Sequence, residues 1–91
     1  MSLYDRDGEP IGLLEWVRRM EDLAYRHVGK TVVDDVEIST VWIGSPPAIF
    51  ETVVFGGELN LTAERYPTLE AAEAGHERWV ARVREAARVS G

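Results

Sequence analysis

The most continuous run of apolar residues lies between positions 36 and 55, VEISTVWIGSPPAIFETVVF. Side chains in its first half alternate with the period of a strand, Val36, Ile38, Thr40 and Trp42 on one face and Glu37, Ser39 and Val41 on the other. The second half is rich in β-branched and aromatic residues, which favour strands. Gly44-Ser45-Pro46-Pro47 separates the halves, and proline has no N–H to give to a ladder. The pattern therefore predicts an antiparallel hairpin that turns at 44–47.

Two further segments, 12–28 and 69–88, have the helical period of amphipathic helices. Their apolar positions are Leu13, Trp16, Val17, Met20, Leu23, Ala24 and His27 in the first, and Leu69, Ala72, His76, Trp79, Val80, Val83 and Ala87 in the second. Gly12 and Thr68 stand where N-caps are expected, and Gly29 is a natural stop for the first helix.

The remaining segments complete a small α+β architecture. Residues 31–43 are expected to lead into the first strand with a bend at Asp34-Asp35, and alternation over 60–66 predicts a short third strand. The predicted order is helix, three-stranded antiparallel meander, helix, in a single domain that spans 1–91. Neither amphipathic helix is stable alone, so we expect both helices to pack on one face of the sheet.

Composition excludes several classes of function. The 91 residues include no cysteine, which excludes a disulfide framework, a thiol nucleophile and a Cys-ligated metal. The formal net charge of −6 argues against general nucleic-acid binding, because phosphates require cationic partners. No apolar run approaches the length of a membrane span, and the N-terminus is charged from Asp5 onward. We therefore expect a cytoplasmic protein with no signal peptide, no membrane contact and no cofactor.

The candidate chemical groups each have a structural interpretation beside the functional one. His27 and His76 fall within or beside the apolar stripes, and His76-Glu77 is not followed by the second histidine of a zinc-protease motif. Packing is favoured over chemistry for both, and an enzyme that uses His76 and Glu77 stays a minor alternative. Asp5-x-Asp7-Gly8 resembles part of a calcium loop but lacks the further ligands, so a turn is expected there.

The distribution of charge points to a protein-binding surface. Six acids lie between Thr31 and Glu64, and that segment contains no Lys or Arg. The uncovered face of the sheet is therefore expected to be acidic, with Val41, Ile43 and Phe50 interspersed, which suits docking of a basic protein. A merely solvated face with a homodimer seam is the alternative. The residues expected to contact the partner are Glu37, Trp42, Phe50 and Glu51.

Helix–strand–strand–strand–helix is also the order of double-stranded-RNA-binding domains, whose second helix begins with basic residues that reach phosphates. Here the corresponding stretch, 68–73, reads TLEAAE and is acidic. We therefore expect no nucleic-acid binding even if the order of elements is shared.

Several segments together resemble a family of short proteins found in actinobacteria and their bacteriophages, which carries no established activity or cofactor. The matching stretches are YDRDGEPI (4–11), LEW (14–16), VEISTVWIG (36–44), PAIFETVVFGG (47–57), RYxT (65–68) and GHE (75–77). This chain departs from the family in the short Ser45-Pro46-Pro47 turn, where relatives commonly have a longer glycine-rich loop, and in Gly12, where relatives usually have a hydroxyl N-cap.

The resemblance implies phage or prophage origin, where small acidic proteins often bind a host protein. We accordingly expect binding to a host factor, in the host cytoplasm if the chain is phage encoded. A structural or oligomeric virion accessory subunit is the alternative, with a homodimer contact through the hairpin or a strand edge.

Overall fold

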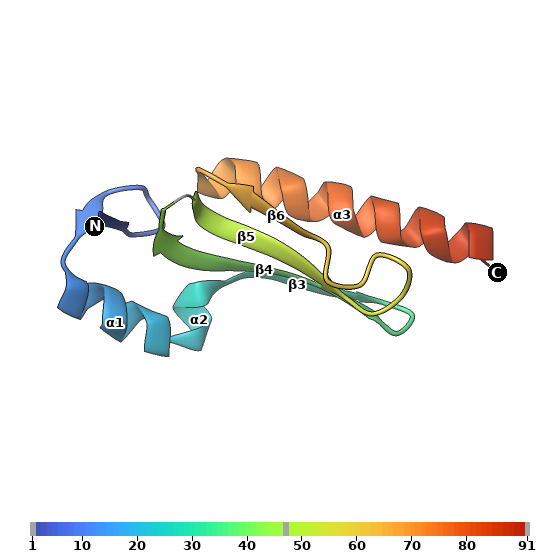
Figure 1. Ribbon diagram of the computed structural model, residues 1–91, viewed down its shortest axis with the longest axis horizontal. Helices are drawn as coiled ribbons and strands as arrows, with labels where there is room; N and C mark the ends of the chain where they lie inside the picture. The colour runs from blue at the N-terminus through green and yellow to red at the C-terminus, as the bar shows by residue number, and fades with distance from the viewer. Residues whose placement is uncertain (1, 47, 91) are drawn as a thin grey trace.

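The computed structural model describes residues 2–46 and 48–90, with only the backbone at residue 90. The elements in order are β1 (Leu3–Tyr4), β2 (Pro10–Ile11), α1 (Leu13–Glu21), α2 (Leu23–Arg26), β3 (His27–Val33), β4 (Val36–Ser45), β5 (Ala48–Phe55), β6 (Ala63–Tyr66) and α3 (Leu69–Ser90). Strands β3 to β6 form one antiparallel sheet in sequence order, and β1 and β2 form a separate small pair. Figure 1 shows α3 running along the sheet, with α1 and α2 at one end. The predicted α+β class is confirmed.

The predicted hairpin of residues 36–55 is confirmed as β4 and β5. Their register pairs Trp42 with Phe50 and Thr40 with Thr52, then shifts between Trp42 and Ser45 before Ser45 pairs with Ala48. The turn is thus tighter than the predicted 44–47, because pairing resumes at Ser45. Pro47, the last residue of the predicted turn, lies outside the described residues.

The sheet has four strands, whereas three were predicted. The missed strand is β3, whose first two residues fall within the predicted first helix, 12–28. The helical stretch is interrupted at Asp22, whose side chain accepts the N–H of Tyr25 (3.2 Å) and caps the short α2. The chain then becomes extended, because a run of β-branched residues, 31–33, pairs with β4.

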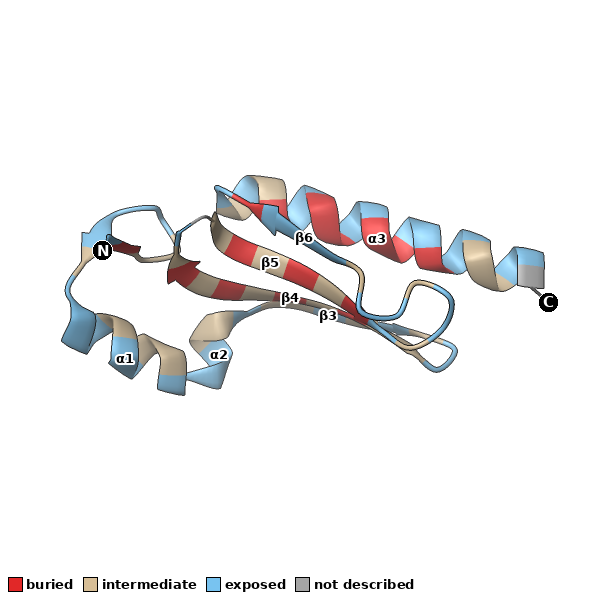
Figure 2. Cartoon of the chain, viewed as in Figure 1, coloured by how far each residue is buried: buried red, intermediate tan, exposed pale blue. Residues whose placement is uncertain are grey.

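The core lies between the sheet and α3. In one cluster, Ile38 and Val54 of the sheet pack against Trp79, Val80 and Val83 of α3. A second cluster joins Trp42, Phe50 and Tyr66 of the sheet to Ala72 of α3. Figure 2 shows buried residues alternating with partly buried ones along β4 and β5, as expected for a sheet covered on one face only.

The expectation that both helices cover one face is confirmed for α3 and is wrong for α1. None of the residues of α1 is buried, and Leu13, Leu14 and Val17 are exposed. The helix lies at the end of the sheet (Figure 1), where the Trp16 indole N–H donates to the carbonyl of Ile43 (3.0 Å). The reason is that β3 pairs with β4 only as far as Val41, so side chains from α1 and α2 cover Trp42 beyond that point.

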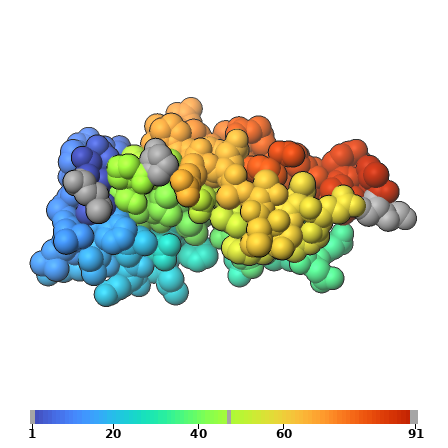
Figure 3. Space-filling model, in the orientation of Figure 1, coloured from blue at the N-terminus to red at the C-terminus, as the bar shows by residue number. Residues whose placement is uncertain are grey.

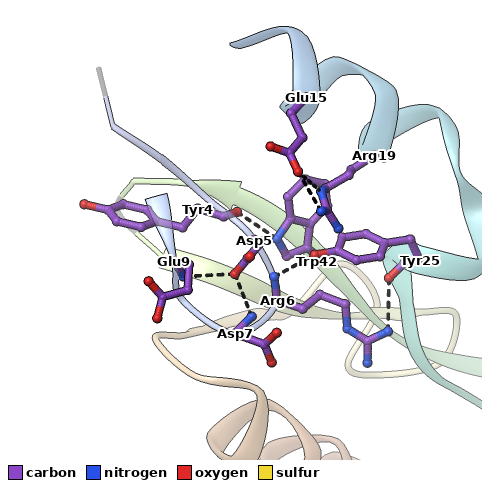
Figure 4. Close-up of polar contacts among 9 residues, drawn as sticks. All are labelled: Tyr4, Asp5, Arg6, Asp7, Glu9, Glu15, Arg19, Tyr25 and Trp42. Carbon is purple, nitrogen blue, oxygen red and sulfur yellow. Dashed lines mark hydrogen bonds and ion pairs between the residues drawn. The ribbon is translucent and has the colours of Figure 1, made fainter. Parts of the chain in front are cut away.

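The N-terminal segment folds back on the same end of the sheet, and the predicted turn at Asp7-Gly8 is confirmed. Its Asp5 carboxylate accepts the backbone N–H groups of Asp7 and Glu9, each at 2.9 Å (Figure 4). The Tyr25 hydroxyl accepts the N–H of Arg6 (2.8 Å), and the Trp42 indole donates to the Tyr4 carbonyl (3.0 Å). The Asp5 carboxylate thus stabilises a turn.

Candidate functional site

A buried histidine and three threonines form a polar network between α3 and the sheet. His76 Nδ1 lies 2.7 Å from the Thr40 hydroxyl, and Nε2 lies 2.9 Å from the Thr31 hydroxyl. The Thr40 hydroxyl in turn meets that of Thr52, directly opposite on the neighbouring strand. Thr40 and Thr52 are fully buried and His76 is 6% exposed. Three adjacent strands, β3, β4 and β5, therefore each contribute one hydroxyl to this network.

The imidazole fits because the strand beneath it carries a glycine. A Cβ at Gly29 would lie 3.2 Å from three atoms of the His76 ring, so the ring rests on bare backbone. Burial lowers the pKa of His76, and the neighbouring Glu77 carboxylate partly offsets this by raising it. The ring is therefore neutral at pH 7, with one nitrogen donating and one accepting. A hydroxyl can fill either role, so the network is satisfied with either tautomer.

A groove of about 430 Å³ opens beside this network, between β3 and α3. Its lining residues are Val28, Gly29, Lys30 and Thr31 of the strand and Glu73, His76 and Glu77 of the helix. Glu77 thus lies in the same groove as His76. Acid–base catalysis here would first require His76 to give up one of its two threonine partners, so the geometry favours a structural role for the imidazole.

The two histidines do not share a site. His27 pairs with Val41 at the exposed start of β3, while His76 is buried against α3's face of the sheet. Within residues 2–46 and 48–90, no three His, Asp or Glu side chains are arranged to hold a metal ion.

A second polar cluster attaches α3 to the other edge strand, β6. One oxygen of the Glu64 carboxylate accepts the Tyr66 hydroxyl (2.8 Å) and the Trp79 indole N–H (3.1 Å), and Arg78 lies 3.3 Å away. These contacts, the Tyr66 hydrogen bond foremost, lower the pKa of Glu64. A Cβ at Gly75 would lie 2.3 Å from the Tyr66 ring, so the helix approaches β6 closely at this glycine.

The structure separates the four residues predicted to contact a partner. Trp42 and Phe50 are fully buried in the core, so the expectation that Phe50 lies on the open face is wrong. The cause is the pairing of Phe50 with Trp42, which places both rings on the side of the sheet that faces α3. Glu37 and Glu51 lie on the open face and stay candidates for binding.

The open face is less acidic than predicted, because each edge strand supplies a cation. Lys30 Nζ lies 3.5 Å from Glu37, and Arg65 Nε lies 2.9 Å from Glu51. These two bases lie immediately before and immediately after the segment of residues 31–64. A charge count limited to that segment therefore omits them.

Exposed apolar residues gather at the end of the sheet far from α1. Val32 and Phe55 flank Glu37 in the register and are 59% and 44% exposed. The loop 56–62 adds Leu61, which is 68% exposed. Figure 3 shows this loop, in yellow, at the surface near the β3–β4 turn and the end of α3.

Leu61 has an unusual backbone conformation for an exposed leucine. Its φ is 66°, its N–H donates to the carbonyl of Val54 (2.7 Å), and the Val54 N–H donates to the carbonyl of Thr62 (3.0 Å). This is a β-bulge of the kind whose first residue is normally glycine. The sequence gives no sign of it, since Leu61 fits the alternation of a strand.

A cavity of about 380 Å³ adjoins this loop. Its apolar floor includes Val36, Leu59 and Val83, and its acidic side chains are Asp34, Asp35 and Glu58. We call this region the distal end, defined by Val32, Phe55, Leu61, Asp34, Asp35 and Glu58.

Comparisons with known proteins assign nothing further: no family model matches the chain, and neither a curated protein nor a solved structure matches it. Among the helices that the structure describes, none combines the length and the apolar character needed to cross a membrane.

Proposed function

We propose that the protein works by binding another protein through the distal end. The partner surface would carry apolar residues to cover Val32, Phe55 and Leu61, flanked by basic residues that face Asp34, Asp35 and Glu58. The resemblance to phage proteins makes a host protein the expected partner.

The observation that carries this proposal is Leu61. A left-handed backbone costs a residue with a side chain about 1–2 kcal/mol, and the exposed side chain offsets none of it in the free protein. Covering a leucine fully contributes about 1.5–3 kcal/mol. A partner that covers Leu61 would therefore offset the cost of holding it in this conformation.

The charges beside it support a basic partner. Asp34 and Asp35 form the β3–β4 turn, and Glu58 lies across the cavity from them. These three carboxylates should speed the association with a positively charged surface. Added salt should screen this attraction and lower the association rate.

The test compares variants of the tagged protein. A partner captured from the native host would be purified and its Kd measured by isothermal titration for Phe55→Ser, Leu61→Gly and, as a control, Leu14→Ser. Leu14 is a well-exposed leucine of α1, which lies at the opposite end of the sheet from the distal end (Figure 1). We expect the first two changes to weaken binding by about tenfold or more, as removal of an interface anchor does, and the control to leave it unchanged.

Equal Kd values for all four proteins would overturn the proposed surface. Sedimentation of the purified protein gives a second check. If it shows only self-association that Phe55→Ser abolishes, the distal end is a homodimer contact and the structural alternative holds instead.

A further inference from the structure

The β3 strand has an edge that no other strand of residues 2–46 and 48–90 occupies. It is the first strand in the sheet order, so within this part of the chain only β4 lies beside it. The two-residue turn at Asp34 and Asp35 makes Val33 and Val36 the hydrogen-bonded pair next to the turn. Alternation along an antiparallel ladder then directs the N–H and C=O groups of Lys30 and Val32 away from β4. These groups can pair with an incoming strand.

The groove between β3 and α3 lies along this edge. Gly29 and His76 form part of its lining, and Glu73 and Glu77, one helical turn apart, line the helix side. Both glutamates are exposed. A strand added beside β3 would therefore have one set of alternate side chains close to two carboxylates.

We propose that an extended, cationic segment of a partner protein binds in this groove as a fifth strand of the sheet. Its backbone pairs with the free groups of Lys30 and Val32, and its Lys or Arg side chains face Glu73 and Glu77. Strand addition of this type takes affinity from main-chain hydrogen bonds and specificity from alternate side chains. The inference rests on the proposed function of protein binding and adds a second contact surface to the distal end.

A cationic peptide fits the edge better than a second copy of the chain does. Pairing of β3 with β3 of another copy about a two-fold axis would place both α3 helices on the same side of the joined sheet. Glu73 and Glu77 would then approach the same two carboxylates of the other copy, and like charges held close together oppose association. A peptide with lysines at alternate positions replaces this repulsion with attraction.

The probe is an acetylated octapeptide of alternating lysine and valine, and the matched control alternates glutamate and valine. Amide hydrogen exchange of the full chain, followed by NMR, reports on individual N–H groups. We expect the lysine peptide to slow exchange at Lys30 and Val32, whose N–H groups point away from β4, and the glutamate peptide to leave both unchanged. If the lysine peptide binds but the exchange rates of these two amides do not change, strand addition is overturned. This test needs only the unmodified protein.

Two pairs of variants separate the contributions. Val32→Pro removes one free N–H and should abolish peptide binding, whereas Val32→Ala keeps that N–H and should retain it. The double change Glu73→Lys and Glu77→Lys should weaken the Kd about tenfold or more, whereas Glu9→Lys with Glu21→Lys alters net charge equally outside the groove. If both double changes weaken the Kd equally, the peptide is attracted by the net charge of the protein and does not bind in the groove, which would overturn the inference.

The failure of this inference differs from that of the proposed function. Phe55→Ser should leave the lysine peptide bound, since Phe55 does not line the groove. If Phe55→Ser weakens the natural partner while no peptide binds at β3, the groove inference fails and the proposed function stands. If the peptide binds as described and the Kd of the natural partner is unchanged by Phe55→Ser and Leu61→Gly, the groove inference stands and the proposed binding surface at the distal end fails.

Discussion

Replacing Thr40 by valine should be one of the most damaging near-isosteric changes in the protein. Thr40 is fully buried, and its hydroxyl lies between His76 Nδ1, at 2.7 Å, and the hydroxyl of Thr52. Valine keeps the shape but removes the hydroxyl, so two buried polar groups lose a partner. Each such group costs about 1–3 kcal/mol. Since His76 keeps its contact with Thr31, we expect a total loss of about 2–4 kcal/mol in the free energy of unfolding.

Urea titration followed by tryptophan fluorescence measures this loss, because Trp42 and Trp79 are buried and report on the core. The companion variants are Thr52→Val and the double variant Thr40→Val/Thr52→Val. Replacing both members of a buried hydrogen-bonded pair costs less than the sum of the two single changes. The double variant should therefore be more stable than additivity predicts.

Two outcomes would refute this reasoning. A cost below about 0.5 kcal/mol for Thr40→Val would show that its hydroxyl is not needed by its neighbours. Strict additivity in the double variant would show that Thr40 and Thr52 act independently, in conflict with their facing positions on β4 and β5.

Three further predictions follow from single contacts. Burial lowers the pKa of His76 below its unfolded value of 6.5, so the unfolded chain binds a proton first as the pH falls. The free energy of unfolding should then decrease below pH 6.5 by at most about 1.4 kcal/mol per pH unit. Urea titrations at several pH values measure this, and the free energy of unfolding of His76→Gln should depend less steeply on pH; an equal pH dependence would contradict this. Gly75→Ala would place a Cβ 2.3 Å from the Tyr66 ring and should cost about 1–3 kcal/mol by thermal denaturation, and an unchanged Tm would be evidence against that close contact. Leu61→Gly should raise stability by about 1 kcal/mol because φ is 66°, and a lower Tm would show that the conformation carries no strain.

The hairpin and the last helix could be predicted because their patterns are local. Alternation from Val36 to Trp42 and the period from Leu69 to Val83 each repeat over several residues, and the structure keeps both. The same reasoning extended the first helix too far. His27 satisfies the helical spacing, but pairing with β4 is a tertiary contact that spacing within one segment cannot reveal.

The candidate sites were less predictable because they depend on contacts between distant segments. The hydroxyls of Thr31 and Thr40 meet His76 across 45 and 36 positions of sequence. Lys30 and Arg65 neutralise acids on the open face only because β3 and β6 lie at its two edges. Leu61 could not be recognised, since nothing in the alternation of 59–65 distinguishes a strand residue from the first residue of a bulge.

A single helix on a four-stranded sheet leaves unequal edges, and two glycines, one on α3 and one on β3, explain the inequality. Strands lie about 4.8 Å apart and a helix is about 10 Å across, so α3 cannot span the sheet. At β6, Tyr66 fills the space against Gly75 of the helix and bonds Glu64, which closes that edge. At β3 the glycine is on the strand: Gly29 admits the His76 ring but supplies no side chain, and a groove remains beside it. The position that allows the buried network therefore also creates the space that a peptide would occupy.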